Sequence, residues 1–184
     1  MKLVILDRDG VINHDSKHFI KSPEEWVAIP GSLEAIALLN QSGFRVVVAT
    51  NQSGIGRGMF DMAALNAMHT KLHRALASLG GRIDAIFFCP HAGDEGCACR
   101  KPKPGLLRQI SERFDINLSG VPMIGDSARD LEAAAAAGAR PILVRSGKGA
   151  KTERDGHLPD GTIVFDDLGA AALHLLTHAP EGRT

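Results

Sequence analysis

The sequence has few of the features that mark membrane, secreted or nucleic-acid-binding proteins. It contains no tyrosine, one tryptophan and only 4% aromatic residues, and its 21 lysines and arginines balance 21 aspartates and glutamates. A neutral chain with few aromatics lacks the basic surface and the stacking groups typical of nucleic-acid binding. No apolar run is long enough for a signal peptide or a membrane span. We therefore expect a cytoplasmic protein with neither nucleic acid nor membrane as a partner.

Cysteine is also scarce, and the three cysteines are grouped. Cys89, Cys97 and Cys99 lie in one short segment, which also contains His91. An odd, clustered set argues against a disulfide framework and favours a metal. Three thiolates and one imidazole form a closed structural set for Zn²⁺. The alternative is a reduced cysteine cluster with an unrelated histidine, but four soft ligands in one loop favour zinc.

Short β-rich segments alternate with longer helical ones along the chain. The helices are indicated by apolar periodicity bounded by capping residues such as Asp61 and by glycines. The predicted strands span residues 3–6, 44–49, 83–88, 121–124, 141–144 and 162–165, and the predicted helices span residues 32–41, 61–79, 104–114, 128–137 and 168–178. Nearly continuous apolar strands joined by helices indicate a parallel sheet covered on both faces. We expect one three-layer, Rossmann-like α/β domain over residues 1–184.

Two carboxylates follow the first predicted strand, where its apolar run ends. Asp7 and Asp9 are two residues apart, so alternation along a strand predicts that their side chains point the same way. Asp126 ends the fourth strand, and Asp130 lies one helical turn further on. If the first and fourth strands are neighbours, Asp7, Asp9 and Asp126 share one crevice at the carboxyl ends of the strands, where ligands bind. Mutual repulsion there favours a hard cation, and Mg²⁺ takes oxygen ligands.

Two more strand ends carry groups suited to phosphate. A row of hydroxyl and amide groups follows the second strand, and two cations precede the helix predicted at residue 104. These residues are Thr50, Asn51, Gln52, Ser53, Arg100 and Lys101. Fixed cations and helix N-termini both favour anions. Combined with Mg²⁺ ligands, they indicate phosphoryl transfer, which depends on positioning and charge neutralisation.

The motifs at the strand ends resemble those of a known family. Asp7-x-Asp9-Gly10, Thr50, Lys101 in an Arg-Lys-Pro sequence, and Asp126 after a glycine match, in order, the four motifs of the haloacid dehalogenase-like phosphatases. One D-x-D motif is weak evidence, but four motifs in this structural context are specific. The resemblance implies a haloacid dehalogenase-like fold and a Mg²⁺-dependent phosphoric monoester hydrolase.

The resemblance also implies a role for each motif residue. Asp7 would be the nucleophile that forms an aspartyl-phosphate intermediate. Asp9 would protonate the leaving alcohol and then deprotonate the attacking water. Thr50 and Lys101 would hold the transferring phosphoryl oxygens. The implied Mg²⁺ ligands are Asp7, the main-chain carbonyl of Asp9, and Asp126, with Asp130 in support.

The cysteine loop narrows the resemblance to one branch. Its CPH…CxCRKPKPG pattern, joined to DRDGVIN and TNQSGIGRG, is similar to the phosphatases that remove the 7-phosphate of D-glycero-D-manno-heptose 1,7-bisphosphate. These enzymes supply nucleotide-activated heptose for lipopolysaccharide and other surface polysaccharides. Histidinol-phosphate phosphatases share the zinc loop and are the alternative. The resemblance implies a phosphosugar substrate. No large insertion follows either early motif, which implies a minimal or absent cap domain, and we expect a monomer. The implied substrate contacts are Asp15, Ser16, Lys17, His18, Asn51, Gln52, Ser53 and Arg100.

Two positions depart from this branch. Ser127 stands where a lysine is common, and the segment 16–18 differs from the usual Gly-aromatic sequence. Both concern the choice of substrate rather than the catalytic core, so histidinol phosphate stays open as an alternative. A DNA 3′-end phosphatase is disfavoured by the balanced charge. A phosphate-sensing protein without turnover is disfavoured by the intact motif set.

Three further patterns receive structural interpretations. The glycine-rich segment 54–58 lacks the third glycine of a dinucleotide fingerprint and is predicted to be an active-site loop. His69 and His73 are one helical turn apart, but no H-E-x-x-H motif joins them, which favours packing or solvent exposure. Residues 145–149 lack the spacing of a P-loop and are predicted to form a turn.

Overall fold

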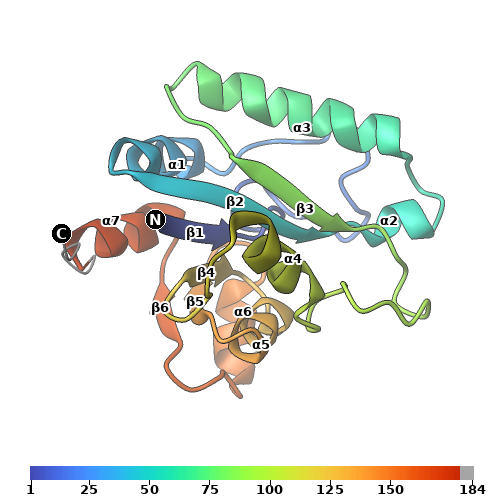
Figure 1. The fold of residues 1–184 in the computed structure, drawn as a ribbon. Coiled ribbons are helices and arrows are strands. Elements are labelled where there is room, and N and C mark those ends of the chain that lie inside the picture. Colours follow the sequence, from blue (N-terminus) through green and yellow to red (C-terminus); the bar gives the residue numbers. More distant parts are fainter. Residues whose placement is uncertain (179–184) are drawn as a thin grey trace.

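The computed structural model describes residues 1–178, so the last six residues of the expected domain lie outside the described part. The strands are β1 (Lys2–Leu6), β2 (Phe44–Asn51), β3 (Ala85–Cys89), β4 (Pro122–Gly125), β5 (Arg140–Val144) and β6 (Ile163–Phe165). They pair in parallel in the order β3-β2-β1-β4-β5-β6 (Figure 1). The chain order reverses beside β1, and such a switch point is where open α/β sheets bind ligands.

Helices cover both faces of this sheet. They are α1 (Ser32–Gln41), α2 (Ser53–Gly56), α3 (Met62–Ala77), α4 (Gly105–Phe114), α5 (Ala128–Ala136), α6 (Gly149–Asp155) and α7 (Leu168–Thr177). Helices α1, α3 and α7 contribute to one core, and α4 and α5 contribute to the other, on the opposite face (Figure 1). Within residues 1–178, no helix is both long enough and apolar enough to cross a membrane. The predicted three-layer parallel α/β fold is confirmed.

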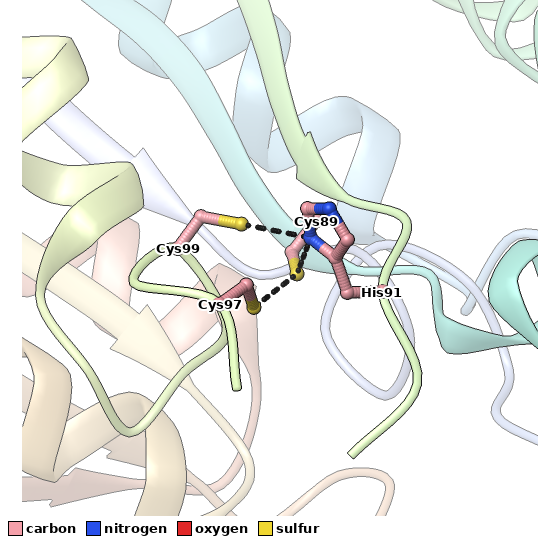
Figure 2. Close-up of side chains that lie close together, drawn as sticks. All are labelled: Cys89, His91, Cys97 and Cys99. Carbon is pink, nitrogen blue, oxygen red and sulfur yellow. Dashed lines mark hydrogen bonds between the residues drawn. The ribbon is translucent and has the colours of Figure 1, made fainter. Parts of the chain in front are cut away.

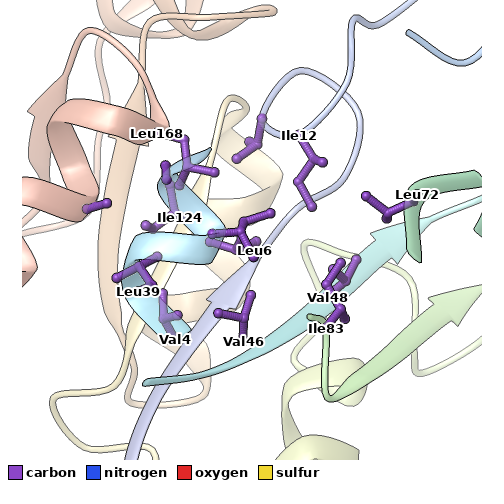
Figure 3. Close-up of a cluster of buried hydrophobic side chains, with 14 of the residues drawn as sticks. Val4, Leu6, Ile12, Leu39, Val46, Val48, Leu72, Ile83, Ile124 and Leu168 are labelled. Atoms are coloured by element: carbon purple, nitrogen blue, oxygen red, sulfur yellow. The ribbon is translucent and has the colours of Figure 1, made fainter. Parts of the chain in front are cut away.

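Alternate residues of β1 belong to the two separate cores. Val4 and Leu6 pack with residues of α1, α3 and α7 (Figure 3), whereas Leu3 and Ile5 pack with residues of α4 and α5. All four side chains are buried. Side chains alternate across a strand, so an uninterrupted apolar run marks a strand covered on both sides. Burying each such side chain contributes about 2 kcal/mol, which anchors the carboxyl end of β1 and therefore Asp7.

Several element boundaries differ from the sequence predictions. Strand β2 continues to Asn51 because its last two residues pair with the end of β3. The segment 54–58, predicted as a glycine-rich loop, overlaps α2, and the segment 145–149, predicted as a turn, leads into α6. These helices have only four and seven residues, so neither contains the repeated apolar spacing from which a helix is predicted.

No cap domain is inserted in the described residues. The long connection between β1 and α1 contains only isolated bridges, and the connection between β2 and α3 contains only α2. Trp26 in the first connection is buried. Lys71 Nζ donates hydrogen bonds to the backbone oxygens of Pro23 and Trp26, at 2.7 and 2.8 Å. These contacts tie the first connection to α3.

Candidate active site

The carboxyl ends of β1 and β4 bring three carboxylates together. These strands are neighbours, as the sequence argument required, and the Asp7 N–H donates to Ile124 O at 2.9 Å. One carboxylate oxygen from each of Asp7, Asp126 and Asp130 lies within 4.8 Å of the others. Three carboxylates this close and this buried repel one another unless cations lie among them.

Lys101 is the cation that the protein itself places in this cluster. Its Nζ lies 2.9 Å from Asp7 Oδ1 and 2.6 Å from Asp130 Oδ1, and donates to Ala49 O at 2.7 Å. Burial alone would lower the pKa of Lys101, but Asp130 and Asp7 outweigh burial and raise it. Lys101 therefore stays charged beside Asp7, where it can neutralise an incoming anion.

Asp130 belongs both to this cluster and to the N-terminus of α5. Its Oδ2 accepts hydrogen bonds from the Ser127 N–H and hydroxyl at 3.0 and 2.7 Å, forming a capping box. Burial would raise the pKa of Asp130, but Lys101 and these hydrogen bonds lower it. Ser127, the departure from the related branch, thus has a structural role, because it orients Asp130 towards Lys101.

The backbone at residues 10 and 147 packs so closely against the Asp126 carboxylate that only glycine fits at these two positions. A Cβ at Gly10 would lie 2.0 Å from Asp126 Oδ2, and a Cβ at Gly147 would lie 2.3 Å from the same atom. Both glycines also have positive φ, 84° and 57°. The Lys148 N–H donates to Asp126 Oδ2 at 2.8 Å, and the Thr152 hydroxyl donates to the Asp126 carbonyl at 2.8 Å. The first turn of α6 therefore completes the site.

Asp9 lines the same cavity as Asp7 and Asp126, as expected, but its carboxylate is not one of the three that cluster. Strand β1 ends at Leu6, so strand geometry does not extend to Asp9. Asp9 Oδ1 accepts hydrogen bonds from Arg8 Nε and Nη2 at 3.0 and 2.8 Å and from Asn13 Nδ2 at 2.8 Å. Asp9 Oδ2 accepts one from Gln52 Nε2 at 3.1 Å. Asp130 takes the expected place of Asp9 among the clustered carboxylates.

Arg8 is a residue of this site that the sequence analysis missed. It is fully buried, with an exposed fraction of 0%. Burial raises the pKa of Asp9, but Arg8 and the hydrogen bonds to Asp9 outweigh burial and lower it. The available signal was a cation between two aspartates at the end of a buried strand, because a buried arginine requires acceptors for its N–H groups.

The polar residues after β2 hold other site residues in place. Thr50 is buried, and its Oγ1 accepts a hydrogen bond from Gln52 Nε2 at 2.9 Å. Asn51 exchanges two hydrogen bonds, both 3.1 Å, with the backbone of Lys101. The amides predicted to contact substrate are therefore already bonded, Asn51 to the Lys101 backbone and Gln52 to Thr50 and Asp9.

A cavity of about 370 Å³ contains the carboxylate cluster. The residues of the predicted site that line it are Asp7, Asp9, Asp15, Ser16, Lys17, Asn51, Gln52, Ser53, Arg100, Lys101, Asp126 and Asp130. Thr50 and His18 do not line it. His18 is exposed, and its N–H donates to Ser16 Oγ at 3.1 Å. Phe19, the next residue, lines the cavity instead.

Five residues that line the cavity were missed: Phe19, Ile20, Arg57, Arg129 and Lys148. Phe19 has φ 64°, a left-handed conformation that is rare for a bulky residue and that often occurs at functional sites. Lys148 Nζ lies 2.8 Å from Asp15 Oδ2, so an ion pair joins the β1–α1 connection to the start of α6. Only the φ value and the tertiary contacts reveal these roles, and no sequence spacing encodes them.

The cysteine loop forms a second cluster, beside the segment that carries Lys101. Figure 2 shows that the side chains of Cys89, His91, Cys97 and Cys99 point towards one another. Cys89 Sγ lies 3.4 Å from His91 Nδ1 and 3.6 Å from Cys97 Sγ, and Cys99 Sγ lies 3.3 Å from His91 Nδ1. Tetrahedral Zn²⁺ with ordinary bond lengths separates its ligands by about 3.5–3.8 Å. The donor set therefore fits Zn²⁺, with His91 contributing Nδ1.

The carboxylate cluster likewise fits a hard cation. Burial and the nearby Asp130 raise the pKa of Asp126 to about 7, and the same two causes raise the pKa of Asp7 well above its ordinary value. Lys101 alone thus leaves two carboxylates destabilised in their charged form. A divalent cation held by Asp7 and Asp126 would remove that penalty, and oxygen ligands are those that Mg²⁺ prefers.

Comparisons with known proteins were made for the whole chain. A family model described as HAD-hydrolase-like matches residues 98–171. The D-glycero-beta-D-manno-heptose-1,7-bisphosphate 7-phosphatase of Bordetella bronchiseptica is 62% identical to this chain, over 97% of this chain and 100% of the relative. The enzyme of the same name from Pseudomonas putida is 57% identical to this chain, over 96% of this chain and 100% of the relative. The crystal structure of D,D-heptose 1,7-bisphosphate phosphatase from B. bronchiseptica, complexed with magnesium and phosphate, has a TM-score of 0.96 and 61% identity, covering 97% of this chain and 100% of that chain.

Proposed function

The chain belongs to the D-glycero-beta-D-manno-heptose-1,7-bisphosphate 7-phosphatase family of haloacid dehalogenase-like hydrolases, and we propose that it removes the 7-phosphate of that sugar bisphosphate. The reaction is a Mg²⁺-dependent hydrolysis of a phosphoric monoester. Its product would supply the synthesis of nucleotide-activated heptose for lipopolysaccharide or other surface polysaccharides. One observation carries the proposal: Asp7, Lys101, Asp126 and Asp130 meet inside a cavity that is lined by further cations.

The first step would transfer the phosphoryl group to Asp7. An oxygen of Asp7 would attack phosphorus, and the bond to the sugar oxygen would break. Lys101 Nζ, 2.9 Å from Asp7 Oδ1, is placed to neutralise a phosphoryl oxygen during this transfer. The Thr50 hydroxyl accepts from Gln52, so its own proton is free to donate to another oxygen. Mg²⁺ bound by Asp7 and Asp126 would supply Lewis-acid polarisation and charge neutralisation.

Asp9 would act as the general acid in the first step and as the general base in the second. Its lowered pKa keeps the carboxylate ionised, which suits the second step, where it would accept a proton from the water that attacks the aspartyl-phosphate. The first step needs a protonated Asp9 to protonate the leaving alcohol. Entry of a dianionic phosphate favours that proton uptake, since a nearby negative charge raises a carboxyl pKa.

The cations around the cavity favour a substrate with a second phosphate. Lys17, Arg57, Arg100, Arg129 and Lys148 line it in addition to Lys101. A sugar bisphosphate presents an anion at each end, so one phosphate can lie at Asp7 while the other meets these cations. Histidinol phosphate carries a protonated amine away from its phosphate, and the same cations would repel that amine. The charge distribution therefore favours the heptose bisphosphate.

Zinc would act structurally in this enzyme. Cys99 is followed directly by Arg100 and Lys101, so a bound Zn²⁺ would hold the segment that presents both cations. Lys103 Nζ also donates to Cys97 O at 2.6 Å, within the same segment. The expected role is preorganisation of the phosphate site rather than chemistry.

We also propose that the chain forms one domain over residues 1–184 and works as a cytoplasmic monomer. A single sheet links both cores in the described residues, which supports one domain. Phosphorylated sugar intermediates are also cytoplasmic substrates. Light scattering that gave a dimer mass at assay concentration would refute the monomer, and an export assay would address location.

The experiment that tests the proposed function compares two substrates. Purified enzyme with Mg²⁺ should show a kcat/KM for heptose 1,7-bisphosphate at least about 100-fold above that for histidinol phosphate. Phosphorus NMR of the product should show loss of the 7-phosphate with the 1-phosphate retained. Omission of Mg²⁺ should abolish turnover. A preference for histidinol phosphate, or loss of the 1-phosphate, would refute the assignment.

A further inference from the structure

Asp9 is oriented by Arg8, and Arg8 has one contact that no motif of the family explains. Two of its nitrogens, Nε and Nη2, donate to Asp9 Oδ1, and Nη2 also lies 3.4 Å from Gln52 Oε1. The remaining nitrogen, Nη1, lies 3.3 Å from Nε2 of His69, a residue of helix α3. The guanidinium is thus held between the site and α3.

The direction of the His69 hydrogen bond follows from chemistry. A guanidinium has five N–H donors and no acceptor, so His69 Nε2 must accept, and its ring proton must be on Nδ1. A protonated His69 would place two cations in contact without an acceptor between them. Burial and Arg8 lower the pKa of His69 to about 4, in agreement with a neutral ring.

The contact bears on the chemistry because a guanidinium is planar and rigid. Fixing Nη1 fixes the direction of Nε and Nη2, and therefore the position of Asp9 Oδ1. Oδ1 accepts three hydrogen bonds, from two Arg8 nitrogens and Asn13, whereas Oδ2 accepts one from Gln52. The less occupied oxygen, Oδ2, is the one that can carry a proton.

We propose that His69 is a positioning residue, which holds the Arg8 guanidinium so that Asp9 Oδ2 points at the leaving oxygen of the substrate. In the first step the proton moves from Asp9 Oδ2 to that oxygen while the phosphorus–oxygen bond breaks and the bond to Asp7 forms. Without an acceptor at residue 69, Arg8 Nη1 would be left buried and unpaired. The guanidinium would then turn towards another acceptor and displace Asp9. This inference rests on the proposed role of Asp9.

The test compares two substrates that differ in their need for that proton. The sugar oxygen released from the bisphosphate is a poor leaving group and must be protonated to depart as an alcohol, whereas p-nitrophenyl phosphate releases a stable phenolate without protonation. The parameter is kcat/KM, which reports transition-state stabilisation through phosphoryl transfer to Asp7. The variants are His69→Leu, which keeps the size but removes the acceptor, and His69→Gln, whose Oε1 can replace Nε2. His73→Ala, an exposed histidine one turn away, is the matched control.

His69→Leu should lower kcat/KM about tenfold for the sugar bisphosphate and less than about twofold for p-nitrophenyl phosphate. His69→Gln should remain within about threefold of the parent on both substrates, and His73→Ala should match the parent. Equal losses on the two substrates, or equal losses in the leucine and glutamine variants, would overturn the inference. Thermal unfolding checks that each variant is folded, and His69→Ala repeats the comparison if His69→Leu does not fold.

Asp9→Asn distinguishes this inference from the proposed function. Its kcat/KM should fall far more for the sugar bisphosphate than for p-nitrophenyl phosphate. An Asp9→Asn variant without that selectivity would refute the acid role of Asp9 itself. A selective Asp9→Asn variant together with a non-selective His69→Leu variant would refute only the role of His69.

Discussion

The described residues contain two clusters of possible metal ligands, which differ in how they are built. The carboxylate centre consists of Asp7, Asp126 and Asp130 around Lys101, and the cysteine loop consists of residues 89–99. In each, one ligand atom from every ligand residue lies within 4.8 Å of the others. The carboxylate centre draws on three separate segments of the chain and contains its own cation. The cysteine loop draws on one segment and contains none.

Because the two clusters are built differently, we expect the carboxylate centre to take part in the reaction and the cysteine loop to support it structurally. The carboxylates perturb one another, because each lies in the field of the others and of Lys101. Their properties therefore depend on sheet order and on burial, and a change at one residue alters the rest. The cysteine loop can form its donor set locally and bears on the reaction through the adjacent Arg100 and Lys101. We therefore expect abrupt losses at the first cluster and graded losses at the second.

The largest effect is expected at the carboxylate centre. Asp7→Asn removes the proposed nucleophile, so kcat for the sugar bisphosphate should fall by at least about 10³-fold. The fold should survive, because the amide can still accept a hydrogen bond from Lys101. Stopped-time phosphate release measures the loss. Asp155→Asn, which removes a surface carboxylate that pairs with Lys151, is the control and should keep parent activity. Near-parent turnover by Asp7→Asn would refute covalent catalysis.

An intermediate effect is expected at the cysteine loop. Cys97→Ser should abolish stoichiometric zinc in the purified protein, because a neutral hydroxyl is a poor replacement for thiolate. Since the loop would then position Lys101 less well, kcat should fall by between about 10- and 100-fold while Mg²⁺ is still bound. Elemental analysis and calorimetric Mg²⁺ titration measure the two metals. Parent protein purified without chelator and free of zinc would contradict the structural zinc site.

The smallest effect concerns the pH dependence of Mg²⁺ binding. The pKa of Asp126, raised to about 7, means that its carboxyl is mostly protonated at pH 6 and mostly ionised at pH 8 in the metal-free protein. Mg²⁺ binding requires the ionised form, so the apparent affinity should rise by up to about tenfold between these pH values. Calorimetric titration measures it. The same affinity at both pH values would contradict the electrostatic picture of this centre.

The stability of the metal-free protein should change with pH in the opposite direction to its Mg²⁺ affinity. The pKa of Asp126 in the folded protein lies above the ordinary pKa of an aspartate, so the stabilising protonated form is present at low pH. That contribution is lost as pH rises through about 7. Mg²⁺ compensates for the ionised carboxylate, so its addition should raise Tm more at pH 8 than at pH 6. A larger gain at pH 6 would reverse the expected sign.

The sequence predicted the fold class and most strand positions, because the apolar runs are long and evenly spaced. It also predicted which residues would gather, since carboxyl ends of parallel strands share one edge of the sheet. It failed where contacts come from short or irregular segments. Residues 145–149 were predicted only as a turn and no helix was predicted at α6, so the contact of Lys148 with Asp126 and its ion pair with Asp15 were not expected. Asp9 was placed with the carboxylates because strand alternation was extended beyond Leu6.

The sequence by itself determined what each cluster is made of: carboxylates and a lysine at strand ends, and three thiolates with one imidazole in a loop. Residue type sets the ligand chemistry, and local spacing suffices for the loop. Only the tertiary structure decided which carboxylates lie close enough to shift one another's pKa. It also decided that Asp9 pairs with Arg8 rather than with those carboxylates, and that a histidine of α3 contacts Arg8. Burial and distance govern electrostatic coupling between charged groups, and both depend on how the chain packs rather than on which residues are adjacent in the sequence.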